Sequence, residues 1–206
     1  MTPERVLEQG IAQLGIEVAQ RERQKMLAYL ALLQKWNKVY NLTAVREPAQ
    51  MVSHHLLDSL AVLPHLWPGK WLDVGCGPGL PGLVLALMRP DWAFTLIDSN
   101  SKKTSFVQQA IVELGLDNAR VCCARVEAWQ AEEKFDGIIS RAFAEAGEFI
   151  KSTRHLLAEN GRWAAMKGEP REELAQLPEG VVMERIVRLQ VPMLDAKRCL
   201  VIMKAV

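Results

Sequence analysis

The sequence has few of the features that mark secreted, metal-binding or membrane proteins. Its four cysteines form no Cys-x-x-Cys pair and its four histidines have no zinc-like spacing, so neither disulfides nor a metal are expected. The longest apolar run, Leu80 to Met88, is too short to span a bilayer, and no secretory signal opens the chain. We therefore expect a cytoplasmic protein with no membrane partner, whose free cysteines are buried as small apolar residues.

An excess of one charge is also lacking. The 206 residues include 25 basic and 24 acidic side chains, a formal net charge of +1. Proteins that bind nucleic acid commonly carry a basic domain, so the composition alone does not indicate RNA binding. Any RNA contact must come from a local patch. Half of the residues are hydrophobic, which is enough for one domain, with or without an extension.

The pattern of apolar residues changes near residue 68. Before it, helical spacing predicts helices at about 2–15, 20–38 and 48–64, with Trp36 and Tyr40 in the core. After it, strands and helices alternate, which indicates a mainly parallel sheet covered by helices, and the last two strands should form an antiparallel hairpin. The predicted strands are 71–75, 93–98, 119–123, 135–140, 161–167, 181–191 and 198–204, and the predicted helices are 81–88, 102–115, 146–157 and 170–176.

A glycine-rich loop follows the first predicted strand, where residues 71–82 read WLDVGCGPGLPG. Glycine permits positive φ and lets a ligand approach the backbone, and the amides that open the next helix can bind ligand oxygens. The dinucleotide fingerprint needs glycine where Leu80 stands, so a nicotinamide-dependent oxidoreductase is disfavoured. The pattern that fits is Asp-x-Gly-x-Gly-x-Gly, with Asp73 first and Gly75 and Gly77 next.

A second acid ends the next predicted strand. Asp98 can accept hydrogen bonds from ribose hydroxyls, and the carboxyl ends of parallel strands meet at the edge where open α/β sheets bind ligands. Loop and acid together resemble motif I of the class I S-adenosylmethionine-dependent methyltransferases, although a glycine loop alone can be just a tight turn.

Three further stretches narrow the resemblance. KWNKVYNLT at 35–43, HLLDS at 55–59 and ISRAF at 139–143, together with GCGPGLPG at 75–82, are similar to the RsmG (GidB) family over essentially the whole chain. The resemblance implies a Rossmann-like α/β methyltransferase domain with a mainly parallel seven-stranded sheet at 69–206, behind an N-terminal helical extension at 1–68. It also implies transfer of methyl from S-adenosyl-L-methionine to N7 of a single guanine in 16S ribosomal RNA, free or in the small ribosomal subunit.

The resemblance also implies where the cofactor is bound. Motif I supplies Asp73, Gly75, Gly77 and Leu80, Asp98 would hold the ribose, Val126 and Glu127 would lie beside the adenine, and Arg141 would close the site. The sequence departs from the family at Cys76, which is still small, and at His54, where a basic residue is common; this leaves a role of position 54 in RNA contact open.

Several charged residues could have either a structural role or a role in binding. Arg141 could instead pair with a neighbouring acid, and His55 and Asp58, three apart on a helix, are expected to contact each other. A basic rim of Arg125, Lys167 and Arg188 at the pocket mouth is the predicted RNA contact.

The absence of two motifs bears on which atom of the substrate is methylated. No Asp/Asn-Pro-Pro-aromatic motif of amino methylation and no Pro-Cys nucleophile is present. Guanine N7 is an unprotonated acceptor that needs orientation but no base, so no catalytic residue is assigned. The alternatives are a small-molecule methyltransferase with residues 1–65 as a lid, a methyltransferase for another RNA, and a non-catalytic module that binds S-adenosylmethionine or RNA.

Overall fold

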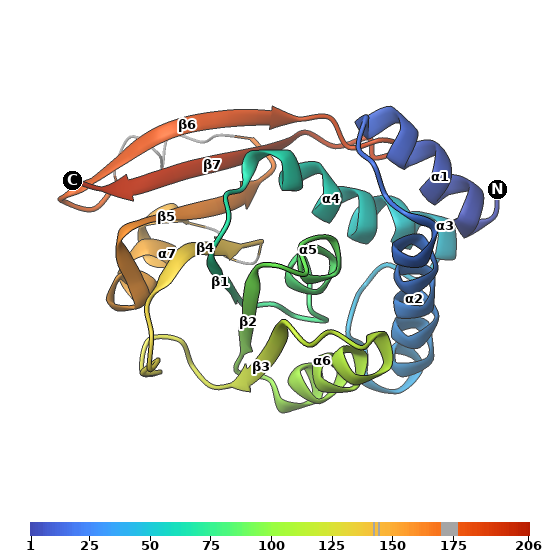
Figure 1. Ribbon diagram of the computed structural model, residues 1–206, viewed down its shortest axis with the longest axis horizontal. Coiled ribbons are helices and arrows are strands. Elements are labelled where there is room, and N and C mark those ends of the chain that lie inside the picture. The colour runs from blue at the N-terminus through green and yellow to red at the C-terminus, as the bar shows by residue number, and fades with distance from the viewer. Residues whose placement is uncertain (142, 144, 170–176) are drawn as a thin grey trace.

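The computed structural model describes residues 1–141, 143, 145–169 and 177–206. At its centre lies a seven-stranded sheet in the order β3-β2-β1-β4-β5-β7-β6 (Figure 1). Strands β1 to β5 run parallel, and β7 is antiparallel to both neighbours, which confirms the predicted sheet and its terminal hairpin. The strands are β1 (Lys70–Val74), β2 (Ala93–Asp98), β3 (Ala119–Cys123), β4 (Phe135–Ser140), β5 (Leu157–Lys167), β6 (Val181–Leu189) and β7 (Arg198–Ala205).

Helices cover both faces of this sheet, and one apolar cluster on each face forms the core. The N-terminal helices pack with α4, α5 and α6 on one face, whereas α7 covers the other (Figure 1). The helices are α1 (Pro3–Leu14), α2 (Gln20–Tyr40), α3 (Pro48–Met51), the π-helix η1 (Val52–Leu57), α4 (Asp58–Val62), the 3₁₀ turn η2 (Leu63–His65), α5 (Gly82–Met88), α6 (Ser101–Leu114), α7 (Ala146–Thr153) and the 3₁₀ turn η3 (Arg154–Leu156).

Some predicted boundaries were wrong. The helix predicted at 48–64 exists, but a π-helix interrupts it, and apolar spacing carries no signal for that turn. The helix predicted at 146–157 ends at Thr153, because Leu157 already pairs with Phe135 in an irregular extension of β5. Strand β6 ends at Leu189, two residues early. The helix predicted at 170–176 lies outside the described residues.

Two predictions of burial were also wrong. Tyr40 is 43% exposed, because it lies at the end of α2, while Trp36 one turn earlier is half-buried against Phe106 of α6. Cys123 is exposed at the end of the edge strand β3, whereas Cys76 and Cys199 are buried as expected.

The N-terminal helices hold the glycine loop in place. The side chain of Tyr29, 2% exposed on α2, donates a hydrogen bond to the Pro78 carbonyl at 2.8 Å. This bond joins residues 49 apart in the chain. Because α2 shares its apolar core with α5 and α6, the loop is supported from outside the sheet. The domain boundary at residue 68 stays a prediction.

We predict that Tyr29→Phe lowers the free energy of unfolding by about 1 kcal/mol, because the buried Pro78 carbonyl loses its donor while the ring packing is kept. Urea unfolding measures the change. Tyr40→Phe is the matched control, since that ring is exposed, and it should leave the unfolding midpoint unchanged. Equal effects of the two substitutions would show that the hydroxyl bond contributes nothing measurable.

Candidate functional site

A cavity of about 290 Å³ opens at the carboxyl ends of β1, β2 and β3, and we call it the Asp98 cavity. Its walls come from the glycine loop, the ends of β1 and β2, the start of α6 and the segment after β3. The lining residues are Val74, Gly75, Ile97, Asp98, Ser99, Lys103, Ala124, Arg125, Val126, Glu127 and Phe143.

The glycine loop is fastened to Asp98. The Gly77 amide donates to Asp98 Oδ2 at 3.0 Å, and the Asn100 amide donates to Oδ1 at 2.9 Å. Each carboxylate oxygen can accept a further bond, so Asp98 can hold a ligand hydroxyl as well. Gly77 has φ +56°, and a Cβ placed there would meet no atom within 4 Å. The space beside the loop is therefore open to a ligand.

Asp73 and Leu80 lie behind the loop, not in the cavity lining. The Gly82 amide donates to Asp73 Oδ2 at 2.8 Å, and a Cβ on Gly82 would lie 2.7 Å from that oxygen. Burial raises the pKa of Asp73 to about 7. Its other oxygen has no hydrogen-bond partner among the described residues, and Leu80 belongs to the apolar core. Asp73 thus shapes the loop from beneath.

A second cavity, of about 390 Å³, lies beyond the end of β4, and we call it the Arg141 cavity. Phe143 lines the Asp98 cavity and Arg141 lines this one, so the segment after β4 borders both. The Lys167 ammonium donates to the Phe143 carbonyl at 3.0 Å across this border. The lining residues are Val45, His54, His55, Asp58, Arg141, Met166, Lys167, Gly168 and Arg198.

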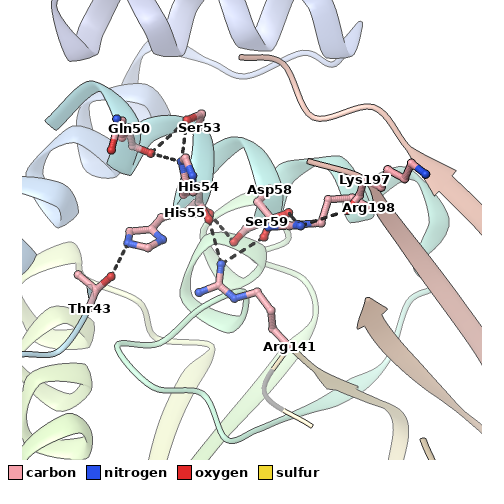
Figure 2. A network of polar contacts seen from close by, with 10 residues as sticks. All are labelled: Thr43, Gln50, Ser53, His54, His55, Asp58, Ser59, Arg141, Lys197 and Arg198. Carbon is pink, nitrogen blue, oxygen red and sulfur yellow. Dashed lines mark hydrogen bonds and ion pairs between the residues drawn. The ribbon is translucent and has the colours of Figure 1, made fainter. Parts of the chain in front are cut away.

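Asp58 is the centre of the polar network in the Arg141 cavity (Figure 2). Its carboxylate, 1% exposed, accepts from Arg141 Nη1 at 3.2 Å and from Arg198 Nε at 3.1 Å. Arg141 Nη1 also donates to the His54 carbonyl at 3.1 Å. The alternative reading of Arg141, pairing with a nearby acid, is confirmed, and the pair forms a wall of the cavity.

The expected contact between His55 and Asp58 was wrong. His55 Nε2 bonds to Thr43 Oγ1 at 3.0 Å, and Figure 2 shows the ring directed away from Asp58. Two guanidinium groups offer charge-assisted bonds that a neutral imidazole cannot match, so Asp58 turns to them. Burial, reinforced by the Arg141 charge, lowers the pKa of His55 to about 4, which keeps the ring neutral at pH 7.

The structure brings together most, but not all, of the sequence-predicted residues. Gly75, Asp98, Arg125, Val126 and Glu127 line the Asp98 cavity. Arg141 and Lys167 line the Arg141 cavity, and Arg188 lines neither, so the predicted rim does not surround one opening. Arg198 was not predicted as a site residue, and the predicted partner of Asp58, His55, was wrong. Arg198 lies 140 residues from Asp58, and no local spacing signals that contact.

The described part of the chain contains neither a metal-binding cluster nor a membrane span. No group of three or more His, Cys, Asp or Glu in the described ranges could hold a metal ion. Among the same residues, every helix is too short or too polar to cross a bilayer.

The sheet order and the position of the Asp98 cavity are those of the class I methyltransferase fold, and similar solved structures share this fold. TrmN from Thermus thermophilus aligns with a TM-score of 0.57 at 20% identity, covering 73% of this chain and 48% of that one. The N-methyltransferase NodS from Bradyrhizobium japonicum, in complex with S-adenosyl-L-homocysteine, aligns with a TM-score of 0.55 at 14% identity, covering 86% and 97%.

Similarity in sequence identifies the family. The GidB family, described as rRNA small subunit methyltransferase G, matches residues 22–201. The ribosomal RNA small subunit methyltransferase G of Laribacter hongkongensis is 54% identical, over 95% of each chain. That of Methylobacillus flagellatus is 55% identical, over 97% of each chain. The chain belongs to the GidB family, which confirms the resemblance seen in its motifs.

We predict that Asp73→Asn stabilises the protein relative to the wild type by an amount that depends on pH. In the unfolded chain the Asp73 carboxyl has its ordinary pKa of 3.8, but in the fold this pKa is raised to about 7. Between these values folding binds a proton, so wild-type stability from this group falls as pH rises. The difference between variant and wild type should grow from about pH 4 to about pH 7 and then level off.

Urea unfolding of both proteins without cofactor, at several pH values, measures this difference. Comparing the two proteins cancels the opposite contribution of His55, whose lowered pKa adds stability as pH rises towards its ordinary value. A difference that stays constant over the whole window would show that the Asp73 carboxyl is not held in its protonated form.

Proposed function

We propose that this protein transfers a methyl group from S-adenosyl-L-methionine to N7 of a single guanine of 16S ribosomal RNA, in the cytoplasm. The observation that carries the proposal is the family match over residues 22–201, in a chain whose fold places two cavities side by side at the carboxyl edge of the sheet. One cavity suits a nucleoside and the other an anionic acceptor.

The residues of the Asp98 cavity fit an adenosine-containing cofactor. Asp98 would accept hydrogen bonds from the ribose hydroxyls. Gly75 lines the cavity and a Cβ on Gly77 would meet no atom, which supports close approach of the ligand to this backbone. Val126 and Glu127, beyond β3, would lie beside the adenine. When bound, S-adenosyl-L-methionine supplies a methyl group activated by its sulfonium. Asp73 acts indirectly, by holding the Gly82 amide beneath the loop.

The charges of the Arg141 cavity favour an anionic acceptor such as RNA. Arg141, Arg198 and Lys167 contribute three positive charges, and Asp58 contributes one negative charge. His55 adds none at neutral pH, because its pKa is lowered to about 4. The cavity is therefore cationic although the protein as a whole is nearly neutral. A nucleotide bound in this cavity would place its phosphate near the two guanidinium groups.

The predicted basic rim follows the same edge of the sheet. Arg125 belongs to the first cavity and Lys167 to the second. Lys167 of β5 and Arg188 of β6 both pair in register with Cys199 of β7. Their backbones are therefore two strand spacings, or about 10 Å, apart. The three cations would follow an RNA backbone along the edge instead of encircling one opening.

The chain's part in the reaction is orientation. Guanine N7 is a lone pair that needs no proton removed, so the residues need only exclude water and align the two reactants. Arg141 is held from two sides, by the His54 carbonyl and by Asp58, and can present a fixed guanidinium to the acceptor. No residue is assigned as a general base.

We predict that small-subunit RNA lacking the modification, incubated with the protein and labelled S-adenosyl-L-methionine, gains label at one guanine. N7-methylguanine carries a ring charge, so borohydride followed by aniline should cut the RNA at that base alone. Primer extension locates the cut, and RNA from a methylated strain is the control that should accept no label.

The outcomes separate the alternatives. Label on a base that resists cleavage would contradict methylation at N7, although the protein would still be an RNA methyltransferase. Label on a small molecule and on no RNA would favour the lid reading of residues 1–65. Binding of the cofactor without transfer to free RNA or to assembled subunits would favour a non-catalytic module.

A further inference from the structure

A third cavity, which the cofactor and acceptor sites do not use, lies between α2 and the segment that follows it. It measures about 480 Å³, and we call it the Lys38 cavity. Its lining residues are Ala31, Gln34, Lys35, Asn37, Lys38, Arg46 and Met51. Three of these carry positive charge and none carries negative charge.

The three cations are available to a ligand. Lys35, Lys38 and Arg46 are exposed, and among the described residues none of them makes an ion pair with a carboxylate. Arg46 donates to the neutral Asn41 side chain at 3.0 Å, which fixes its direction and leaves its charge unbalanced. The adjacent acid, Glu47, instead caps the Gln50 amide at 2.7 Å.

A favourable interaction with the helix dipole explains only part of this arrangement. Lys38 lies in the last turn of α2, where a cation is stabilised by the unpaired carbonyls. Lys35 is nearly a turn earlier, and Arg46 lies outside the helix. Because Lys35 and Lys38 are three apart, both project from one side of α2, towards Arg46. The helix dipole therefore leaves Lys35 and Arg46 unexplained.

The floor of the cavity is built from buried contacts. Asn37, buried on α2, donates to the Thr43 carbonyl at 3.0 Å and accepts from the Thr43 amide at 2.9 Å. Met51 beneath is fully buried. These bonds set the path of residues 41–47 and hence the place of Arg46, so the protein's own contacts shape the cavity.

The Lys38 cavity adjoins the Arg141 cavity. Val45 lines the latter and the next residue, Arg46, lines the former. The hydroxyl of Thr43 also reaches His55, a wall residue of the Arg141 cavity, at 3.0 Å (Figure 2). Only the backbone of residues 43–46 separates the two cavities, so one extended ligand could reach both.

We propose that the Lys38 cavity binds backbone phosphates of the acceptor RNA, next to the nucleotide held at Arg141. This rests on the proposed function, and it adds a second, N-terminal contact for the same strand. Cations without carboxylate partners beside a cationic acceptor cavity match a polyanion better than a protein surface. Sequence specificity would come from the acceptor site, since phosphates carry no sequence information.

The test is a triple variant, Lys35→Gln, Lys38→Gln and Arg46→Gln, with Arg5→Gln, Arg21→Gln and Lys151→Gln as control. All six side chains are exposed, and both triples lower the net charge equally. KM for RNA should rise at least about tenfold in the first triple and stay unchanged in the control. The slope of log KM against log salt concentration should also become shallower by up to about 2, because each lost phosphate contact of a single strand removes about 0.7. Saturated kcat and the Kd for S-adenosyl-L-methionine should not change.

Equal KM values and salt slopes in the two triples would overturn the proposal. So would crosslinks from thiouridine-labelled RNA to the wild-type protein that avoid residues 31–46, a readout independent of variant folding. A wild-type protein that transfers no methyl to RNA would instead overturn the proposed function, so the two failures are distinguishable.

Discussion

The buried carboxylate of Asp58 is the constraint on which the arrangement of the Arg141 cavity, the proposed acceptor site, depends. It lies at the start of α4 and receives guanidinium groups from the end of β4 and the start of β7. Removing one partner of a buried pair leaves an uncompensated charge and typically costs about 3–5 kcal/mol. The pairs are only partly enclosed, with about a quarter of each arginine side chain exposed, so the cost here is smaller.

What Asp58 contributes is location more than stability. A long arginine side chain at a strand end has many rotamers, and the bonds to Asp58 and the His54 carbonyl select one. In the proposed function the N-terminal helices would therefore form part of the site as well as cover the sheet. They also support the cofactor side, where Tyr29 holds the Pro78 carbonyl of the glycine loop. Both reactants would be positioned by contacts between the helical extension and the sheet.

The sequence predicts well what depends on local chemistry. Short stretches of sequence are enough to predict the glycine loop, the acid at the end of β2 and the alternation of strands and helices. The structure places Gly75 and Asp98 in one cavity. Burial was harder to predict. Asp73 shares the motif but lies behind the loop, because it bonds to Gly82 nine residues away.

Ion pairs between residues far apart in the chain could not be predicted from local sequence spacing. The spacing of His55 and Asp58 suggested a helix pair, but Asp58 pairs with residues 83 and 140 positions away. Only the sheet order, which places β7 beyond β5, brings Arg198 to the cavity. The π-helix that precedes Asp58 changes which side chains share a face, and no residue type in it marks the change.

The most direct measurement of the central claim is a double-mutant cycle between Asp58→Asn and Arg141→Gln, read as kcat/KM for methyl transfer to RNA. If Asp58 acts by positioning Arg141, each single variant should lose most of what the double variant loses, with a coupling of about 1–3 kcal/mol. Losses that add to within about 0.5 kcal/mol would contradict the account, because the two side chains would then act independently.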